Sequence, residues 1–412
     1  MNSFSKVDIK IPFSFILFSL IALVASQWIV FQNVDLIVEG VFRVPNLWMA
    51  THLLILGFAV MVVMGAMYQM VPVVFMTPIW SERFGYLQFW VTALGIIWLS
   101  VSLGVKLDHV VYGGAVAVTG VLMFLFQMFM SMKKQKEKTI VTWLVTGALI
   151  SFLLTVIGGL LLAINFSYGQ LFNHESLIKS HVMLGVVGWF TLLIIGFSYQ
   201  LVPMFSLSHN FSMKWSKKLY VIYVLGIICL IISFWLDYSP FEIIGWLLLV
   251  IGFTLFLLDM REILTKRSKK RLDRSFLFAT FAIYFGWVTH IVALIISLLG
   301  LGNAFIWGWL VYLYLMTWVI FSILGYLKKI VPVLWWTLKY SDRVGKEKDI
   351  PTIKDLVNEK AIGFIYIGVV TGTLGFAFAL LIQNALLIQL FQGLILLSVV
   401  CFSISIGRII FK

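Results

Sequence analysis

Three of the six histidines stand inside long apolar stretches of the sequence, where an imidazole is unusual. They are His52, His181 and His290. An ionisable side chain within such a segment is costly to bury in lipid, so its presence points to a functional role. Imidazole is also the commonest side-chain ligand for metals. We therefore treat these three histidines as candidate site residues.

His181 begins a row of residues that share one face of a predicted helix. The row continues through Gly185, Gly188, Leu192 and Gly196, in steps of three or four residues, and such steps keep side chains on one helical face. A histidine above a row of glycines leaves space for a flat ligand. The alternative is that His181, about one turn inside the membrane surface, hydrogen-bonds to a lipid headgroup or a loop.

His290 follows the sequence YFGWVT and lies further from the ends of its apolar stretch. Its neighbours Tyr284, Trp287 and Thr289 offer ordinary packing and hydrogen-bonding partners. A structural role is therefore the alternative to a ligand role for His290.

The composition is that of an integral membrane protein. Hydrophobic residues make up 62% of the chain and charged residues 11%, which is outside the range of soluble domains. The apolar stretches recur at about 20 residues, the length of a helix that spans a bilayer. We predict an all-α integral membrane protein, a single membrane domain over residues 1–412 with twelve transmembrane helices. Their expected ranges are 12–32, 46–76, 83–105, 110–132, 139–164, 177–205, 217–236, 241–260, 275–299, 305–335, 361–383 and 386–407.

The basic residues predict the orientation in the membrane. If the chain crosses twelve times, all but three of the 30 Lys and Arg residues fall on one side, and the exceptions are Arg43, Lys106 and Lys179. This asymmetry is typical of cytoplasmic loops. We expect a multi-pass protein of the plasma membrane with both termini in the cytoplasm. The basic loops then contact anionic lipid rather than nucleic acid.

The chain contains an internal repeat. An offset of 131 residues relates Gly65 to Gly196, and it carries the sequence GAMYQMVPVVF onto GFSYQLVPMF. A third, weaker copy is GYLKKIVPVLWW, which starts at Gly325. Twelve helices then divide into three four-helix repeats around a pseudo-threefold axis, at about 1–135, 136–265 and 266–412. A helix-shaping role for the shared glycines and prolines is favoured over shared chemistry, since the third copy replaces Tyr-Gln with Lys-Lys.

The twelve spans and the repeated V-P motif resemble subunit I of the haem-copper oxidase superfamily. The segment VPVVFMTPIWSERFGYLQFWVTALG, from Val71, is similar to the second-to-third-helix region of that family. The family binds a low-spin haem through histidines on its second and tenth helices. A second haem and a copper ion use histidines on the sixth, seventh and tenth. Here the expected seventh and tenth helices contain no histidine, so the usual oxygen-reducing centre is not expected.

The resemblance implies a haem of the b type and leaves copper open as a second metal. His52 and His181 are the expected haem or metal ligands, either jointly on one iron or at separate sites, and His290 is the next candidate. The geometry is awkward for a regular helix, in which His52 lies about 140° from Gly57 around the axis. Met183 occupies the position that the repeat makes equivalent to His52, and it therefore competes as a second axial ligand.

The functional expectation is electron transfer or handling of oxygen or nitric oxide, rather than full terminal oxidase activity. A quinol or cytochrome donor and partner subunits would accompany such a role. Two alternatives stay open at this point. One is a non-catalytic assembly or interaction protein with the oxidase fold, and the other is a haem- and copper-containing protein of nitric-oxide stress.

Overall fold

The computed structural model describes residues 7–169, 171–347 and 349–411. Residues 1–6 and Lys412, which belong to the first and third expected repeats, lie outside that range. Within the described residues, twelve helical spans are long and apolar enough to cross a membrane, and no strand longer than an isolated bridge occurs. The all-α membrane class with twelve spans is therefore confirmed, while the division into three repeats stays a prediction.

Nine spans consist of a single α-helix or an α-helix with a short 3-10 start. These are α1 (Lys10–Gln32), α5 (Glu82–Val105), η2 with α6 (Leu107–His109 and Val110–Met132), α7 (Ile140–Tyr168), α10 (Ser216–Leu236), α11 (Ser239–Thr265), α12 (Arg274–Leu298), α15 (Glu359–Leu381) and α16 (Ala385–Ile410). Outside the spans lie α2 (Val34–Val38) and η6 (Ile353–Leu356), and η5 (Ser341–Arg343) forms the last turn of the tenth span.

The second, sixth and tenth spans are interrupted by π-helix. The second span consists of α3 (Pro45–His52), η1 (Leu53–Val60) and α4 (Met61–Phe75). The sixth consists of α8 (His174–Val182), η3 (Met183–Thr191) and α9 (Leu192–Ser206). The tenth contains α13 (Ala304–Leu313), η4 (Tyr314–Ile320) and α14 (Phe321–Tyr340). The most apolar windows of the sixth and tenth spans are 78% and 83% buried, against 33–56% for the other spans. These two spans therefore lie at the centre of the bundle, and π-helical turns are frequent at functional sites.

Polar side chains cap the ends of several spans. Ser81 accepts a hydrogen bond from the backbone N–H of Phe84, and Asn173 accepts one from Ser176. Each bond satisfies an N–H group that the first turn of a helix leaves without a backbone partner. The cap at Asn173 fixes the start of α8, the helix that carries His181.

The prolines of the repeated motif lie inside helices near their ends. Pro72 lies in α4 and Pro203 in α9, and both helices end within four residues at a left-handed residue, Met76 or Leu207. The expected role of proline in ending the helix fits these two spans. Pro332 does not end its span, because α14 continues to Tyr340.

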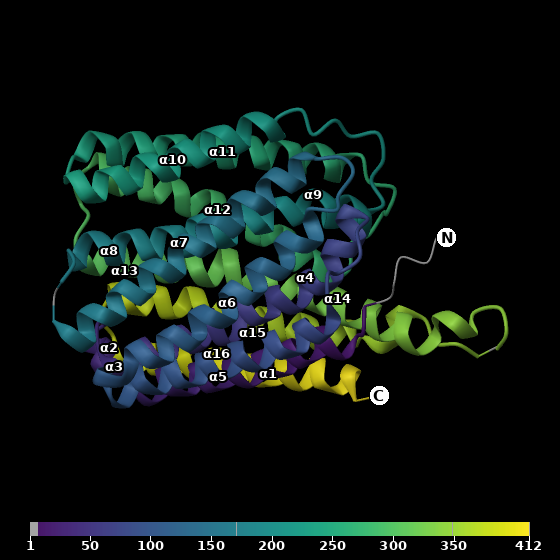
Figure 1. Ribbon diagram of the computed structural model, residues 1–412, viewed down its shortest axis with the longest axis horizontal. Coiled ribbons are helices and arrows are strands. Elements are labelled where there is room, and N and C mark those ends of the chain that lie inside the picture. The colour runs from purple at the N-terminus through teal and green to yellow at the C-terminus, as the bar shows by residue number, and fades with distance from the viewer. Residues whose placement is uncertain (1–6, 170, 348, 412) are drawn as a thin grey trace.

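The two ends of the described chain lie at the same end of the bundle. Figure 1 shows α1 beginning and α16 ending on the side from which the segment around residues 341–358 projects. The starts of α3, α8 and α13 lie at the opposite end. An even number of crossings produces this arrangement. We call the end that carries α3 and α8 the α3/α8 end.

Candidate functional site

A cavity of about 410 Å³ lies between the second to sixth spans and the tenth. His52 and His181 both line it, and we call it the histidine cavity. Most of its wall is aliphatic or aromatic, with Ile96, Phe152 and Leu315 among the contributors. The structure thus brings together the two histidines that the sequence singled out as ligands.

The two imidazoles are held in the same way. Nδ1 of His52 lies 2.8 Å from the carbonyl oxygen of Trp48, and Nδ1 of His181 lies 2.9 Å from that of Thr155. A carbonyl can only accept, so Nδ1 carries the hydrogen in both rings. This tautomer leaves the lone pair of Nε2 available. Metal-ligating histidines are usually fixed by such a bond from their other nitrogen.

The π-helix removes the angular difficulty at His52. The 140° offset from Gly57 assumed a regular α-helix, but η1 begins directly after His52. In a π-helix the hydrogen bonds join residues five apart, so residues with that spacing lie close to one face. That assumption was wrong for this span. His52 lines the cavity.

Glycines of α7 make room for the ring of His181. A Cβ atom on Gly159 would lie 2.9 Å from Cε1 of His181, whereas one on Gly158 would keep 3.7 Å from the nearest His181 atom. Neither glycine stands out in the sequence, because the contact depends on how the fifth and sixth spans pack.

The expected row of glycines below His181 has two different roles. Gly185 lines the histidine cavity. Gly188 and Gly196 instead pack against α7, where added Cβ atoms would meet Ser151 at 2.9 Å and Leu144 at 3.2 Å. The row therefore serves close helix contact as well as ligand space.

Met183 and His290 are not brought to this cavity. Met183 is buried at the start of η3. Val182 and Gly185 line the cavity, whereas Met183 is not among the described residues that do so. His290 has both ring nitrogens engaged, with Nδ1 2.6 Å from the Gly286 carbonyl and Nε2 2.9 Å from the Tyr223 hydroxyl. Neither position favours iron ligation, and their ligand roles stay predictions.

A hydrogen-bonded aromatic cluster surrounds His290 at the centre of the bundle. It joins Tyr223 of the seventh span, Tyr314 and Trp318 of the tenth, and Thr191 of the sixth. The Tyr314 and Thr191 oxygens lie 2.6 Å apart, and the Trp318 indole donates to Thr191 at 3.1 Å. The cluster fills the region between these spans with side chains.

The tyrosines of the repeated motif make bonds between helices. Tyr68 donates to Gln88 of α5 at 3.1 Å, and Tyr199 donates to Asp259 of α11 at 2.7 Å. Lys328, at the third equivalent position, donates to the Ser405 carbonyl of α16 at 2.9 Å. This pattern fits the structural role favoured from the sequence.

Asp259 is a buried carboxylate that was not predicted from the sequence. The expected eighth span ended at residue 260, which placed Asp259 at the surface. The helix in fact continues to Thr265, and Asp259 is only 1% exposed. The signal available in the sequence was the acidic pair Asp259 and Glu262, which share one helical face.

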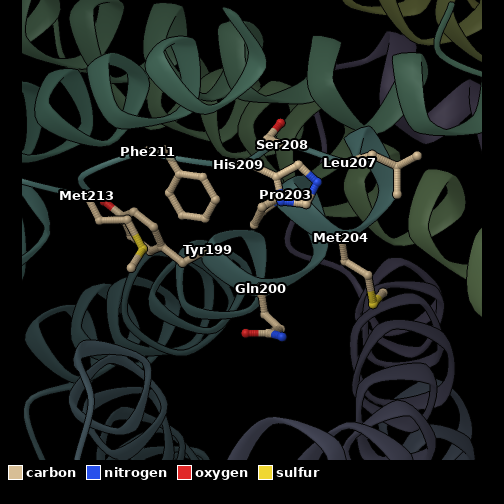
Figure 2. Close-up of a pocket in the computed structure, with 9 residues that line it drawn as sticks. All are labelled: Tyr199, Gln200, Pro203, Met204, Leu207, Ser208, His209, Phe211 and Met213. Carbon is tan, nitrogen blue, oxygen red and sulfur yellow. The ribbon is translucent and has the colours of Figure 1, made fainter. Parts of the chain in front are cut away.

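A second pocket lies at the other end of the sixth span, beside the repeated motif (Figure 2). Figure 2 shows Tyr199, Phe211 and Met213 on one side of it and Met204 on the other, with His209 and Gln200 between them. It is a shallow surface hollow rather than an enclosed space. Its residues come from the end of α9 and the loop that follows.

The histidine cavity fits a haem. It is apolar, and two imidazoles project into it with Nε2 free to bind iron. The chain has no C-x-x-C-H sequence, so a covalently attached c-type haem is not indicated. For copper, the described residues contain no group of three or more His, Cys, Asp or Glu side chains placed to hold a metal ion.

Comparison with known proteins places the fold. The sequence matches no protein-family model and no curated protein. The structure is similar to that of a haem-copper terminal oxidase solved by cryo-electron microscopy as a dimer, with a TM-score of 0.71. The match covers 98% of this chain and 83% of the oxidase chain, at 12% sequence identity. The chain is a multi-pass membrane protein with the fold of the haem-copper oxidases.

Proposed function

We propose that this protein binds one b-type haem between His52 and His181 and passes electrons within a membrane complex. The observation that carries the proposal is the matched pair of imidazoles in the histidine cavity. Each is fixed through Nδ1 to a backbone carbonyl, with Nε2 left for iron. Bound haem would supply a one-electron iron couple.

Electron transfer is favoured over oxygen reduction for two reasons. Two imidazole ligands would fill both axial positions of an iron and leave none for a gas. In addition, the aromatic cluster around His290 occupies the space between the sixth, seventh, ninth and tenth spans. Copper is left out of the proposal because no suitable ligand group occurs among the described side chains.

The protein is proposed to lie in the plasma membrane with both termini in the cytoplasm. The concentration of Lys and Arg on one side supports this orientation. The histidine cavity then lies near the outer surface, at the α3/α8 end. A quinol or a cytochrome would reach the haem from that side, and partner subunits would carry the electron onward.

Substitution of the two ligands tests the proposal. The purified full-length protein should show a reduced-minus-oxidised spectrum of low-spin haem b. His52→Ala and His181→Ala should each lose haem or convert it to a high-spin form. His109→Ala is the matched control, since His109 is exposed at the end of another span.

Two results would reject the proposal. One is a colourless wild-type protein from haem-replete cells, which would favour the assembly or interaction role. The other is an unchanged low-spin spectrum in both histidine variants.

A further inference from the structure

A guanidinium that is ion-paired with a carboxylate lies at the mouth of the histidine cavity. Arg43 lines the cavity and is the only Lys or Arg among the described residues that do so, and no Asp or Glu lines it. His174 lines it too. Arg43 precedes α3 and His174 begins α8, so both lie at the α3/α8 end. The wall of the cavity is otherwise mostly apolar.

Arg43 is held in place from across the cavity mouth. Its guanidinium binds Glu175 through two nitrogens, at 2.7 and 3.4 Å. The bond links the start of the second span to the start of the sixth, the two spans that carry His52 and His181. Further N–H groups of the guanidinium remain for a second carboxylate.

The distance between His174 and His181 along their helix suits a porphyrin. His174 lies seven residues before His181 in the same span, which corresponds to about 10 Å along a helix. This is the order of the distance from a haem iron to the carboxylates of its two propionate arms. The 131-residue offset that relates Gly65 to Gly196 also relates Arg43 to His174, so one cationic or hydrogen-bonding side chain comes from each repeat.

We propose that Arg43 and His174 anchor the two propionates of the porphyrin bound between His52 and His181. This inference rests on the proposed function. Arginine is suited to the role because its guanidinium carries five N–H donors, so the two bonds to Glu175 leave N–H groups for a propionate. His174 offers a ring N–H to the second carboxylate. The pair fixes which edge of the porphyrin faces the membrane surface.

The test compares haemin with its dimethyl ester, which lacks the two carboxylates. Full-length apoprotein in detergent is titrated with each porphyrin, and affinity is read from the Soret band. Wild type should bind the ester roughly tenfold more weakly than haemin, the size expected for hydrogen bonds to a charged group. Arg43→Met should bind haemin more weakly than wild type does, and should keep only the part of the preference for haemin that His174 supplies. Arg43→Lys, which keeps the charge without the fork, should fall between.

The ester distinguishes loss of a propionate anchor from a purely structural effect of the Arg43 substitution. A variant that only loosens the contact with Glu175 would weaken both porphyrins equally, and that result overturns the inference. Lys106→Met is the matched control, since Lys106 does not line the cavity, and it should keep the wild-type preference. If wild type binds haemin and its ester equally, the propionate anchor is rejected and the haem proposal stands. Failure of both porphyrins to bind wild type rejects the haem site itself.

Discussion

Tyr199 donates a 2.7 Å hydrogen bond to Asp259, and the two side chains tie the sixth span to the eighth. Asp259 is almost fully buried and also receives a longer bond from the backbone N–H of Trp215, at 3.4 Å. A buried carboxylate depends on such donors, because losing one leaves charge without compensation. The equivalent Tyr68 binds an uncharged partner, Gln88.

Tyr199→Phe should therefore destabilise the protein by roughly 1–3 kcal/mol. Tyr68→Phe should cost less, since its partner is neutral. The measurement is unfolding by SDS titration of each variant in detergent. Asp259→Asn supplies the control: in that background, Tyr199→Phe should lose most of its effect. Equal costs for the two tyrosine variants would argue against a charged role for Asp259.

Gly159 lets the His181 ring lie close to α7. Gly158, its neighbour in the chain, lies further from the ring. An added Cβ would meet Cε1 of His181 at 2.9 Å from Gly159, but would keep 3.7 Å from Gly158. Both changes to alanine raise helix propensity by a similar amount, about 1 kcal/mol. The comparison therefore isolates the contact with the histidine.

We expect Gly159→Ala to shift the electron paramagnetic resonance signal of the low-spin haem and to lower haem affinity. Gly158→Ala should resemble wild type in both. The hydrogen bond from His181 to the Thr155 carbonyl resists movement of the ring, so the shift reports strain at the ligand rather than unfolding. Identical spectra for the two variants would place the iron away from His181.

Asp273 joins two features at the start of α12. One oxygen caps the helix through the backbone N–H of Phe276, and the other binds Lys329 of α14 at 2.8 Å. Burial raises the pKa of Asp273, but the hydrogen bond and charge of Lys329 outweigh it, so the pKa lies below the ordinary value of 3.8. A lowered pKa means that the ionised form stabilises the fold above the unfolded-state pKa.

Asp273→Asn should keep the cap and lose the ion pairs with Lys329 and Lys269, at a cost of about 1 kcal/mol near neutral pH. The difference from wild type should disappear as the pH falls through the lowered pKa of Asp273. Thermal unfolding of both proteins from about pH 7 to about pH 3 measures this. A difference that stays constant, or grows, at acidic pH would contradict the assignment.

The sequence was sufficient for the span number and for the two cavity histidines, because lipid burial imposes a length on each helix and makes an intramembrane imidazole conspicuous. It was not sufficient for the direction of His52, since a regular helix was assumed and a π-helical turn follows that residue. Nothing in the sequence assigned a role at the cavity to Gly159, and Arg43 was marked only as a basic residue on the side with few others. Their roles at the cavity arise from contacts between different spans.

The aromatic cluster around His290 bears on whether the protein binds carbon monoxide or reduces oxygen. The Tyr223 hydroxyl donates to Nε2 of His290 at 2.9 Å, and Thr191 receives the Trp318 indole N–H at 3.1 Å. These side chains occupy the centre of the bundle, and the seventh and tenth spans supply no histidine. We therefore expect about one haem per chain, no carbon monoxide shift in the reduced spectrum, and no cyanide-sensitive oxygen consumption with a reduced donor.

His52→Ala provides the positive control for that experiment. Removal of one axial imidazole opens a position on the iron, so any haem that this variant retains should become high-spin and bind carbon monoxide. The wild-type protein should stay unreactive under the same conditions, because both proposed ligands, His52 and His181, are bonded through Nδ1 and keep Nε2 for iron. A carbon monoxide shift in wild type, or two haems per chain, would mean that a second site exists or that one histidine is not a permanent ligand. Cyanide-sensitive oxygen consumption would show that the protein is a terminal oxidase despite the histidines missing from the seventh and tenth spans.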